Sequence, residues 1–270
     1  MNNPLGADVS VEMIGSSRAS QYLETNRYNR NPKPAKISAF VRDMQAGDWL
    51  FNGETIKFDD AGMLIDGQNR LLAVEEANVE LPFLVVRGLP RNTQSTMDTG
   101  TARCFSDSLR MRGFTHSMEL ASVTNLVLRY EIGQGQPVQR TASISELDRT
   151  FSRHSWIADE MSVWMPLARK GAIPASLTGL SWWLFSRVDV DDAMDFFRKL
   201  TTGADIGEGS SILVLRRVLE QDKRPFNIAG QRWRLALLIK AWNKYRTGEF
   251  TRILQFKEGG HYPEKFPTPQ

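Results

Sequence analysis

Strand-like patterns gather in the first 90 residues of this 270-residue chain, and helical patterns fill most of the rest. Residues 54–58 alternate between polar and apolar side chains, as a half-buried strand does. A turn-like stretch separates them from the apolar residues 63–65, so these two segments are predicted to form a hairpin. Residues 82–87 are mostly apolar, which favours a buried strand. Few strand signals follow Gly88.

This uneven distribution of patterns predicts an α+β protein. We expect a compact domain with a small mixed sheet over residues 1–112. Amphipathic helices within it are predicted at about 37–47 and 66–78. A mostly α-helical domain is expected over 113–249, and an irregular tail over 250–270.

The segment 62–73, with the sequence GMLIDGQNRLLA, carries the strongest functional signal. An apolar strand end runs into Asp66 and Gly67, and a helix begins at once with Arg70 in its first turn. Free backbone amides at a helix N-terminus, a glycine that permits close approach and an arginine together form an anion site, most often for phosphate. The alternative is an ordinary turn in which Asp66 caps the helix and Arg70 joins a surface ion pair.

A polar, basic loop precedes these elements along the chain. Asn26, Asn29 and Arg30 carry donors suited to phosphate oxygens. The alternative is that the asparagines only hold the loop itself through local turns. The loop leads toward the segment 62–73, and this order favours a shared phosphate site.

Composition excludes several classes of protein and of site. The single cysteine, Cys104, rules out an intramolecular disulfide, and only three histidines make a zinc site of Cys and His improbable. No apolar run approaches the roughly 20 residues that span a bilayer. The N-terminal residues lack the basic and apolar regions of a signal peptide. We therefore expect a cytoplasmic protein with no membrane partner.

The net charge of +3 is small, but positive charge gathers in residues 223–257. That segment holds nine Lys and Arg residues against one acid, Glu249, a net of +8. Such a stripe can hold a nucleic-acid backbone, and a plain solvated face gives the same pattern. The candidates for contact with DNA phosphates are Arg232, Arg234, Lys240, Lys244 and Arg246.

A second glycine-bearing loop, residues 207–210, precedes a predicted helix. It could bind an anion, but no strand leads into it, so a loop with Ser210 as the helix cap is favoured. Trp182 and Trp183 are interpreted as core residues rather than as a platform on which bases stack.

The order of elements from Asn26 to Arg87 resembles the N-terminal domain of the ParB/sulfiredoxin superfamily. It is most similar to ParB-like proteins of bacteriophages and integrated elements of actinobacteria, which carry an Asp-Gly-Gln-His-Arg-Leu motif. Residues 66–71 match that motif except at Asn69. A later Asp-x-Gly-x-x-Arg segment of these relatives is matched by Asp98, Gly100 and Arg103.

The resemblance implies a nucleotide-binding protein, with ATP or CTP and Mg²⁺ as ligands, in the cytoplasm of a bacterial host. The phosphates would lie against Gly67, Gln68, Asn69 and Arg70, beside the loop residues Asn26, Asn29 and Arg30. Sulfiredoxins have a cysteine where this chain has Gln68, so their chemistry is not expected. The phage relatives have histidine at position 69, and asparagine cannot relay a proton.

Three functions follow from this interpretation. The first is a ParB-like protein that binds a nucleotide and DNA. The second is a phosphotransferase acting on a nucleic-acid base or a small hydroxyl compound, in which Asp66 holds the metal and Glu54 is a second catalytic acid. The third is an interaction module without catalysis. The oligomeric state, including a homodimer, stays open.

Overall fold

The computed structural model describes residues 6–27, 29–97, 103–170, 173–259 and 261–270. The first part of the chain contains β1 (Asp8–Ile14), α1 (Ser16–Leu23), α2 (Pro34–Gln45), β2 (Thr55–Asp59), β3 (Leu64–Asp66), α3 (Gln68–Ala77), β4 (Leu81–Leu89) and the short 3-10 helix η1 (Arg91–Thr96). The rest contains α4 (Phe105–Met111), α5 (Ser117–Ile132), α6 (Ile144–Arg153), α7 (Trp156–Asp159), α8 (Met161–Lys170), α9 (Ala175–Ser186), α10 (Val190–Thr202), α11 (Ser211–Glu220) and α12 (Ile228–Arg246). No helix of the described ranges has the length and apolar character needed to cross a membrane.

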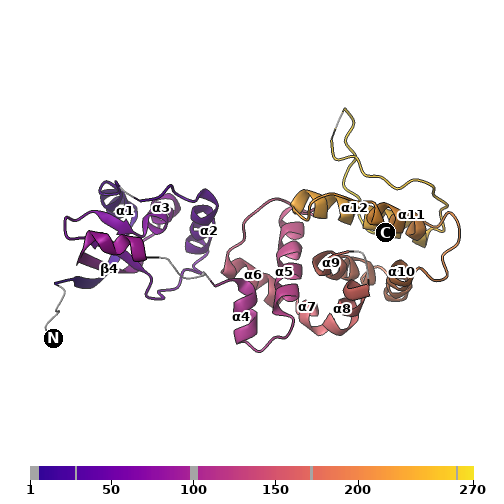
Figure 1. The fold of residues 1–270 in the computed structure, drawn as a ribbon, viewed down its shortest axis with the longest axis horizontal. Helices are drawn as coiled ribbons and strands as arrows, with labels where there is room; N and C mark the ends of the chain where they lie inside the picture. Colours follow the sequence, from indigo (N-terminus) through magenta and orange to yellow (C-terminus); the bar gives the residue numbers. More distant parts are fainter. Residues whose placement is uncertain (1–5, 28, 98–102, 171–172, 260) are drawn as a thin grey trace. The chain divides into compact units, whose positions relative to one another are not determined.

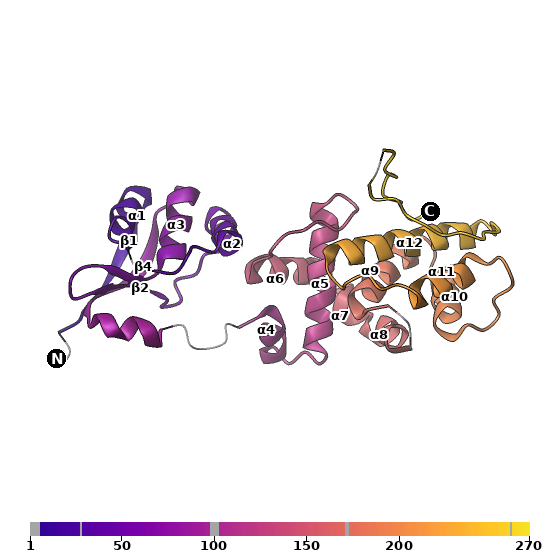
Figure 2. The ribbon, with the colours of Figure 1, turned by 45° about the horizontal axis from the view of Figure 1, so that its top comes forward.

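The predicted α+β architecture is confirmed: a small mixed sheet with helices precedes a mostly helical region. The four strands lie in the order β1-β4-β2-β3. Strand β4 is antiparallel to β1 and parallel to β2, and β2 and β3 form the predicted antiparallel hairpin. Helices α1, α2 and α3 lie on one face of the sheet (Figures 1 and 2). Their apolar sides pack there with the buried Ile56, Phe58, Phe83 and Val85.

Strand β1 is absent from the elements predicted above, although its side chains alternate. The alternation is reversed relative to a usual half-buried strand, because Val9, Val11 and Met13 are the exposed side chains. Glu12 instead lies on the side of the helices. A charged residue in an inward position obscures the period-two signal, which depends on the apolar side chains facing the core.

Glu12 can lie inward because three side chains donate hydrogen bonds to its carboxylate. Arg87 of β4 donates at 2.5 Å, Tyr22 of α1 at 2.5 Å and Ser10 at 2.9 Å. Burial alone would raise the pKa of Glu12, but these bonds lower it from its ordinary value of 4.5 to about 2. The network joins β1, β4 and α1.

The depressed pKa of Glu12 predicts an acid-sensitive N-terminal unit. The stabilisation is fully present above pH 4.5, where the carboxyl is ionised in both states, and is lost as the pH falls toward 2. We expect a loss on the order of 2 kcal/mol over that window in the wild type, and a flatter profile in Glu12→Gln. Hydrogen exchange of the β4 amides, measured against pH, checks this. Parallel profiles for the two proteins would contradict it.

The helical unit is built around α9. This helix packs against α5, α8, α10 and α12, and its small and apolar side chains are almost all buried (Figure 1). Trp182 is buried as predicted, and Trp183 stacks on Trp156 with ring centroids 5.5 Å apart. Asp189 accepts a hydrogen bond from the amide of Asp192 and so caps α10.

The chain divides between Arg103 and Cys104 into two compact units, and residues 141–145 belong with the first. Helix α4 therefore belongs to the helical unit, although it precedes the predicted boundary at residue 112. Ser143 ties the inserted segment to α2 by donating a hydrogen bond to Asp43 at 2.6 Å. The tail from residue 250 contains no helix or strand where it is described, yet it packs on the helical unit through the buried Leu254 and Phe256.

Candidate phosphate-binding site

Helix α3 begins without a side-chain cap. Its N-cap residue is Gly67, with φ +105°, rather than the Asp66 considered from the sequence. The amides of Arg70 and Leu71 donate to the carbonyl of Gly67. Within the described residues, the amides of Gln68 and Asn69 have no protein acceptor. Two donors without a protein partner thus lie at the positive end of a ten-residue helix, the end that favours an anion.

The loop from Asn26 to Lys33 is fastened to this helix end by the two buried side chains of the first turn. Asn26 donates to Oε1 of Gln68 at 3.1 Å, and Nε2 of Gln68 donates to the carbonyl of Arg30 at 2.6 Å. The backbone amide of Lys33 donates to Oδ1 of Asn69 at 3.1 Å. Gln68 and Asn69 therefore position the loop through their side chains, and only their backbone amides can serve a ligand.

Asn29 has the same kind of positioning role. Its Nδ2 donates to the carbonyl of Leu64 at 2.8 Å, and its Oδ1 accepts from Gln94 at 2.9 Å. The amide side chains of Asn26 and Asn29 are thus engaged in holding the loop, which is the alternative that the sequence left open. The loop still carries the exposed cations Arg27, Arg30 and Lys33 beside α3.

The guanidinium of Arg70 is bound by acids and by a strand carbonyl. It lies 3.0 Å from Glu54 and 3.3 Å from Asp66, and it donates to the carbonyl of Thr55 at 2.6 Å. Lys57 also pairs with Asp66, at 3.1 Å. The two cations and two acids neutralise each other. The side chain of Glu54 is 63% exposed, so this ion pair is screened and an incoming anion could exchange with it.

Gly67 is required by the packing of α3 against β2. A Cβ atom at this position would lie 2.6 Å from Cδ1 and 3.2 Å from Cα of Ile56. The sequence suggested instead that this glycine allows a phosphate to approach. The contact with Ile56 accounts for the glycine without any ligand.

The expected metal and catalytic roles of Asp66 and Glu54 find no support in the geometry. Both carboxylates are engaged with Arg70, and the described ranges contain no group of three or more acidic, His or Cys side chains placed to hold a metal. Of the later motif, Asp98 and Gly100 lie outside the described residues. Arg103 is exposed.

The expected contact of Arg234 with DNA is wrong, because this residue is only 3% exposed. Its guanidinium pairs with Asp222 at 2.7 Å, donates to the carbonyl of Arg224 at 2.6 Å and lies over the ring of Phe226. Burial raises the pKa of Asp222, but hydrogen bonds from Arg224 and the charges of Arg234 and Arg224 give a net lowering. Arg234 thus holds the loop before α12.

The other four candidates for contact with DNA each pair with an acid. Most of these acids lie outside residues 223–257, so the sequence count of +8 overstates the local field. The pairs are Arg232–Glu258 at 2.9 Å, Lys240–Glu264 at 2.9 Å, Lys244–Glu249, and Arg246–Asp192 at 3.0 Å. The alternative of a neutralised, solvated face agrees better with this arrangement than a phosphate-binding stripe.

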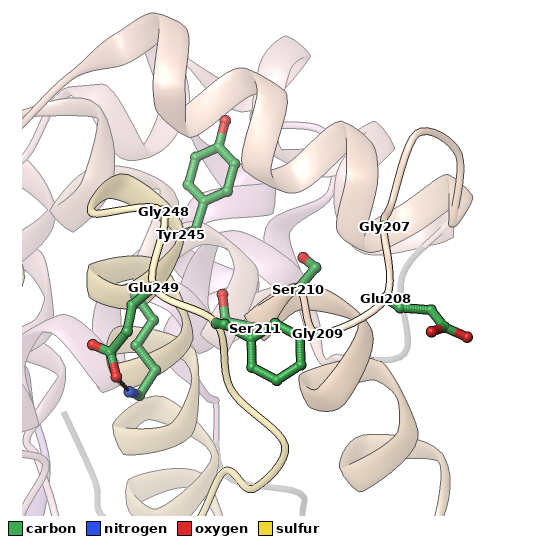
Figure 3. Close-up of a pocket in the computed structure, with 10 residues that line it drawn as sticks. Gly207, Glu208, Gly209, Ser210, Ser211, Tyr245, Gly248 and Glu249 are labelled. Carbon is green, nitrogen blue, oxygen red and sulfur yellow. Dashed lines mark hydrogen bonds and ion pairs between the residues drawn. The ribbon is translucent and has the colours of Figure 1, made fainter.

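A hollow of about 290 Å³ lies where the 207–210 loop meets the end of α12 and residues 248–250 (Figure 3). Ser210 accepts a hydrogen bond from the amide of Ile212 and so caps α11, as predicted. Lys244 and Glu249, which both line the hollow, pair with each other. Since these polar groups have protein partners, the loop is assigned a structural role.

Comparisons of the chain with protein-family models, with curated proteins and with solved structures find no match. The fold consists of an α+β unit with a mixed sheet, followed by a helical unit. The candidate site is the uncapped N-terminus of α3.

Proposed function

We propose that the N-terminal unit binds the phosphate groups of a nucleoside triphosphate, ATP or CTP, at the start of α3, as a ParB-like nucleotide-binding protein. The observation that carries this proposal is the uncapped end of α3, where the amides of Gln68 and Asn69 have no acceptor in the described part of the chain. Helix ends of this kind satisfy their donors with a cap, water or a ligand.

The charges around this helix end support the same ligand. The loop held by Gln68 and Asn69 carries three exposed cations, Arg27, Arg30 and Lys33, and its backbone at Arg30 and Lys33 is bonded to the first turn of α3. Arg70 would add a further cation once a phosphate displaced Glu54. Mg²⁺ would be bound mainly by phosphate oxygens and water, since nucleotide-bound magnesium needs few protein ligands.

A thermal-shift screen of ATP and CTP with Mg²⁺ tests the proposal. Binding to the native state raises the melting temperature, and we expect one of the two nucleotides to do so in the wild type. The double variant Arg27→Glu/Lys33→Glu should bind at least about tenfold more weakly, because it places repulsive charges beside the phosphates. Arg217→Glu, at an exposed position of the helical unit, is the matched control and should bind as the wild type does. A wild type that neither nucleotide stabilises would contradict the proposal.

Glu54→Gln separates nucleotide binding from phosphoryl transfer. If Arg70 contacts phosphate, removing its exposed acidic competitor should tighten nucleotide binding about two- to fivefold, as expected for a screened ion pair. If Glu54 is instead a catalytic acid, the variant should bind nucleotide unchanged and lose transfer of labelled phosphate to an acceptor. Titration calorimetry and a labelled-ATP assay on the same protein distinguish these outcomes.

DNA contact through α12 is not part of the proposal, because Arg234 is buried and the other four cations are paired. Nor does an observation favour the phosphotransferase, since Arg70 neutralises both of its proposed acids.

A further inference from the structure

Strand β1 forms an edge of the sheet that no other strand of the described ranges covers. It lies at one end of the strand order and pairs with β4 over seven residues without a register shift. It contains no proline and no lysine, and its inward charge, Glu12, is neutralised by Arg87 of β4. An edge strand of this length offers its backbone N–H and C=O groups to another strand.

The opposite edge of the same sheet is covered. The amide of Leu64 in β3 donates to Oγ1 of Thr25 at 3.2 Å, and its carbonyl accepts from Asn29 at 2.8 Å. The carbonyl of Ile65 accepts from Gln94 of η1 at 3.1 Å. The fold thus uses the loop after α1 and the helix η1 to close one edge, and no comparable set of bonds closes β1 in the described residues.

The outward side chains of β1 are apolar. Val9, Val11 and Met13 are 55%, 61% and 49% exposed. They lie on the face opposite the helices, and their neighbours on β4 extend the stripe. These neighbours are Val86, Leu84 and Pro82. A contiguous apolar surface along an open edge marks a contact site.

Pro82 also indicates which way the backbone of β1 faces. Met13 lies opposite Pro82, which has no N–H to donate. The carbonyl of Met13 instead accepts from Arg18 at 3.3 Å. Because ladder positions alternate, Val9, Val11 and Met13 are then the residues whose backbone groups point away from β4.

We propose that two copies of this chain pair through β1, antiparallel, about a two-fold axis at Val11. In that register Val11 lies opposite Val11 of the second copy, and Val9 lies opposite Met13 of the second copy, so apolar side chains meet apolar side chains. Ser10 lies opposite Glu12 of the second copy, and the two acids do not face each other. The strand is therefore self-complementary, as an isologous interface requires.

In the same register, the charge at one end of β1 is opposite in sign to the charge that the second copy brings to it. Arg18 is half exposed and lies at the Met13 end of the strand, where it contacts the carbonyl of Met13. Asp8 is exposed at the other end. Antiparallel pairing brings Asp8 of each copy to Arg18 of the other, which gives two equivalent ion pairs. The interface is small, so we expect a dimer with a Kd on the order of micromolar.

Disulfide trapping tests the register. Cys104→Ser provides a background without cysteine, and serine is a suitable helix cap at that position. Val11→Cys should then give a disulfide-linked dimer, because paired residues have Cα atoms about 5.5 Å apart. Val9→Cys is the matched control, since the two copies of residue 9 would lie about 14 Å apart. Equal cross-linking of both variants, or of neither, would overturn the proposal.

Sedimentation equilibrium of the full chain tests the dimer itself. We expect Val11→Lys to raise the dimer Kd at least about tenfold, and Leu50→Lys, at an exposed loop position, to leave it unchanged. Arg18→Asp should weaken the dimer, and adding Asp8→Arg should restore it. The pair that Arg18 makes with Glu12 in its own chain is lost in both proteins, so restoration reports the pair between chains. A wild type that stays monomeric to about 100 µM, or a Val11→Lys variant with an unchanged Kd, would overturn the proposal.

Discussion

Arg234→Ala is expected to lower the free energy of unfolding of the helical unit by about 3–5 kcal/mol. Its side chain and that of Asp222 are 4% and 1% exposed, and the two pair at 2.7 Å. Removing the arginine leaves the carboxylate of Asp222 buried with much of its charge compensation lost. The carbonyl of Arg224 also loses its donor.

Tryptophan fluorescence during urea unfolding measures this effect. Trp49 is the only tryptophan of the first unit, so the signal reports mainly the helical unit. Arg246→Ala is the matched control. It breaks an ion pair with Asp192 whose partners are 30% and 40% exposed, and it should cost less than about 1 kcal/mol. Equal losses in the two variants would show that burial does not decide the role of Arg234.

Gly67→Ala is expected to destabilise the N-terminal unit by about 2–4 kcal/mol. The positive φ of +105° strains any L-residue with a side chain, and the added Cβ would lie 2.6 Å from Cδ1 of Ile56, a fully buried residue. Rotating Ile56 away does not remove the 3.2 Å approach to its Cα, so α3 or β2 must shift.

Gly62→Ala isolates the contribution of the backbone. Gly62 also has a positive φ, +77°, but a Cβ there would have no atom within 4 Å. Gly62→Ala should lower the free energy of unfolding by about 1 kcal/mol, from backbone strain alone. Hydrogen exchange on peptides from β2 and β4 measures the loss of stability in Gly67→Ala and in Gly62→Ala. If the two variants lose the same stability, the packing of α3 against Ile56 is not what requires glycine at position 67.

Local sequence patterns predicted most of the helices and strands of the first unit, because these elements are specified by residues close together in the sequence. The hairpin of β2 and β3, the helix after Gly67 and the apolar β4 were all predicted from spacing, and the structure contains them. Strand β1 was missed for a tertiary reason. Its inward Glu12 is stable only because Arg87, 75 positions later, donates to it.

The local geometry at the start of α3 was predicted in part. The sequence indicated a helix end with free amides, and two such amides are present. It could not show that Asn69 holds Lys33, or that Glu54 and Asp66 bind Arg70, because those partners are set by the path of the chain.

The sequence by itself determined most helices and strands other than β1, because periodicity, glycine and capping residues act over a few positions. Only the tertiary structure decided which charges remain available. Asp222 forms a buried ion pair with Arg234. Glu258 and Glu264 of the C-terminal tail form ion pairs with cations of α12. Each attraction depends on distance in space rather than along the chain. Six of the nine basic residues in 223–257 therefore became members of ion pairs, while the described residues leave the outer edge of β1 without a covering strand.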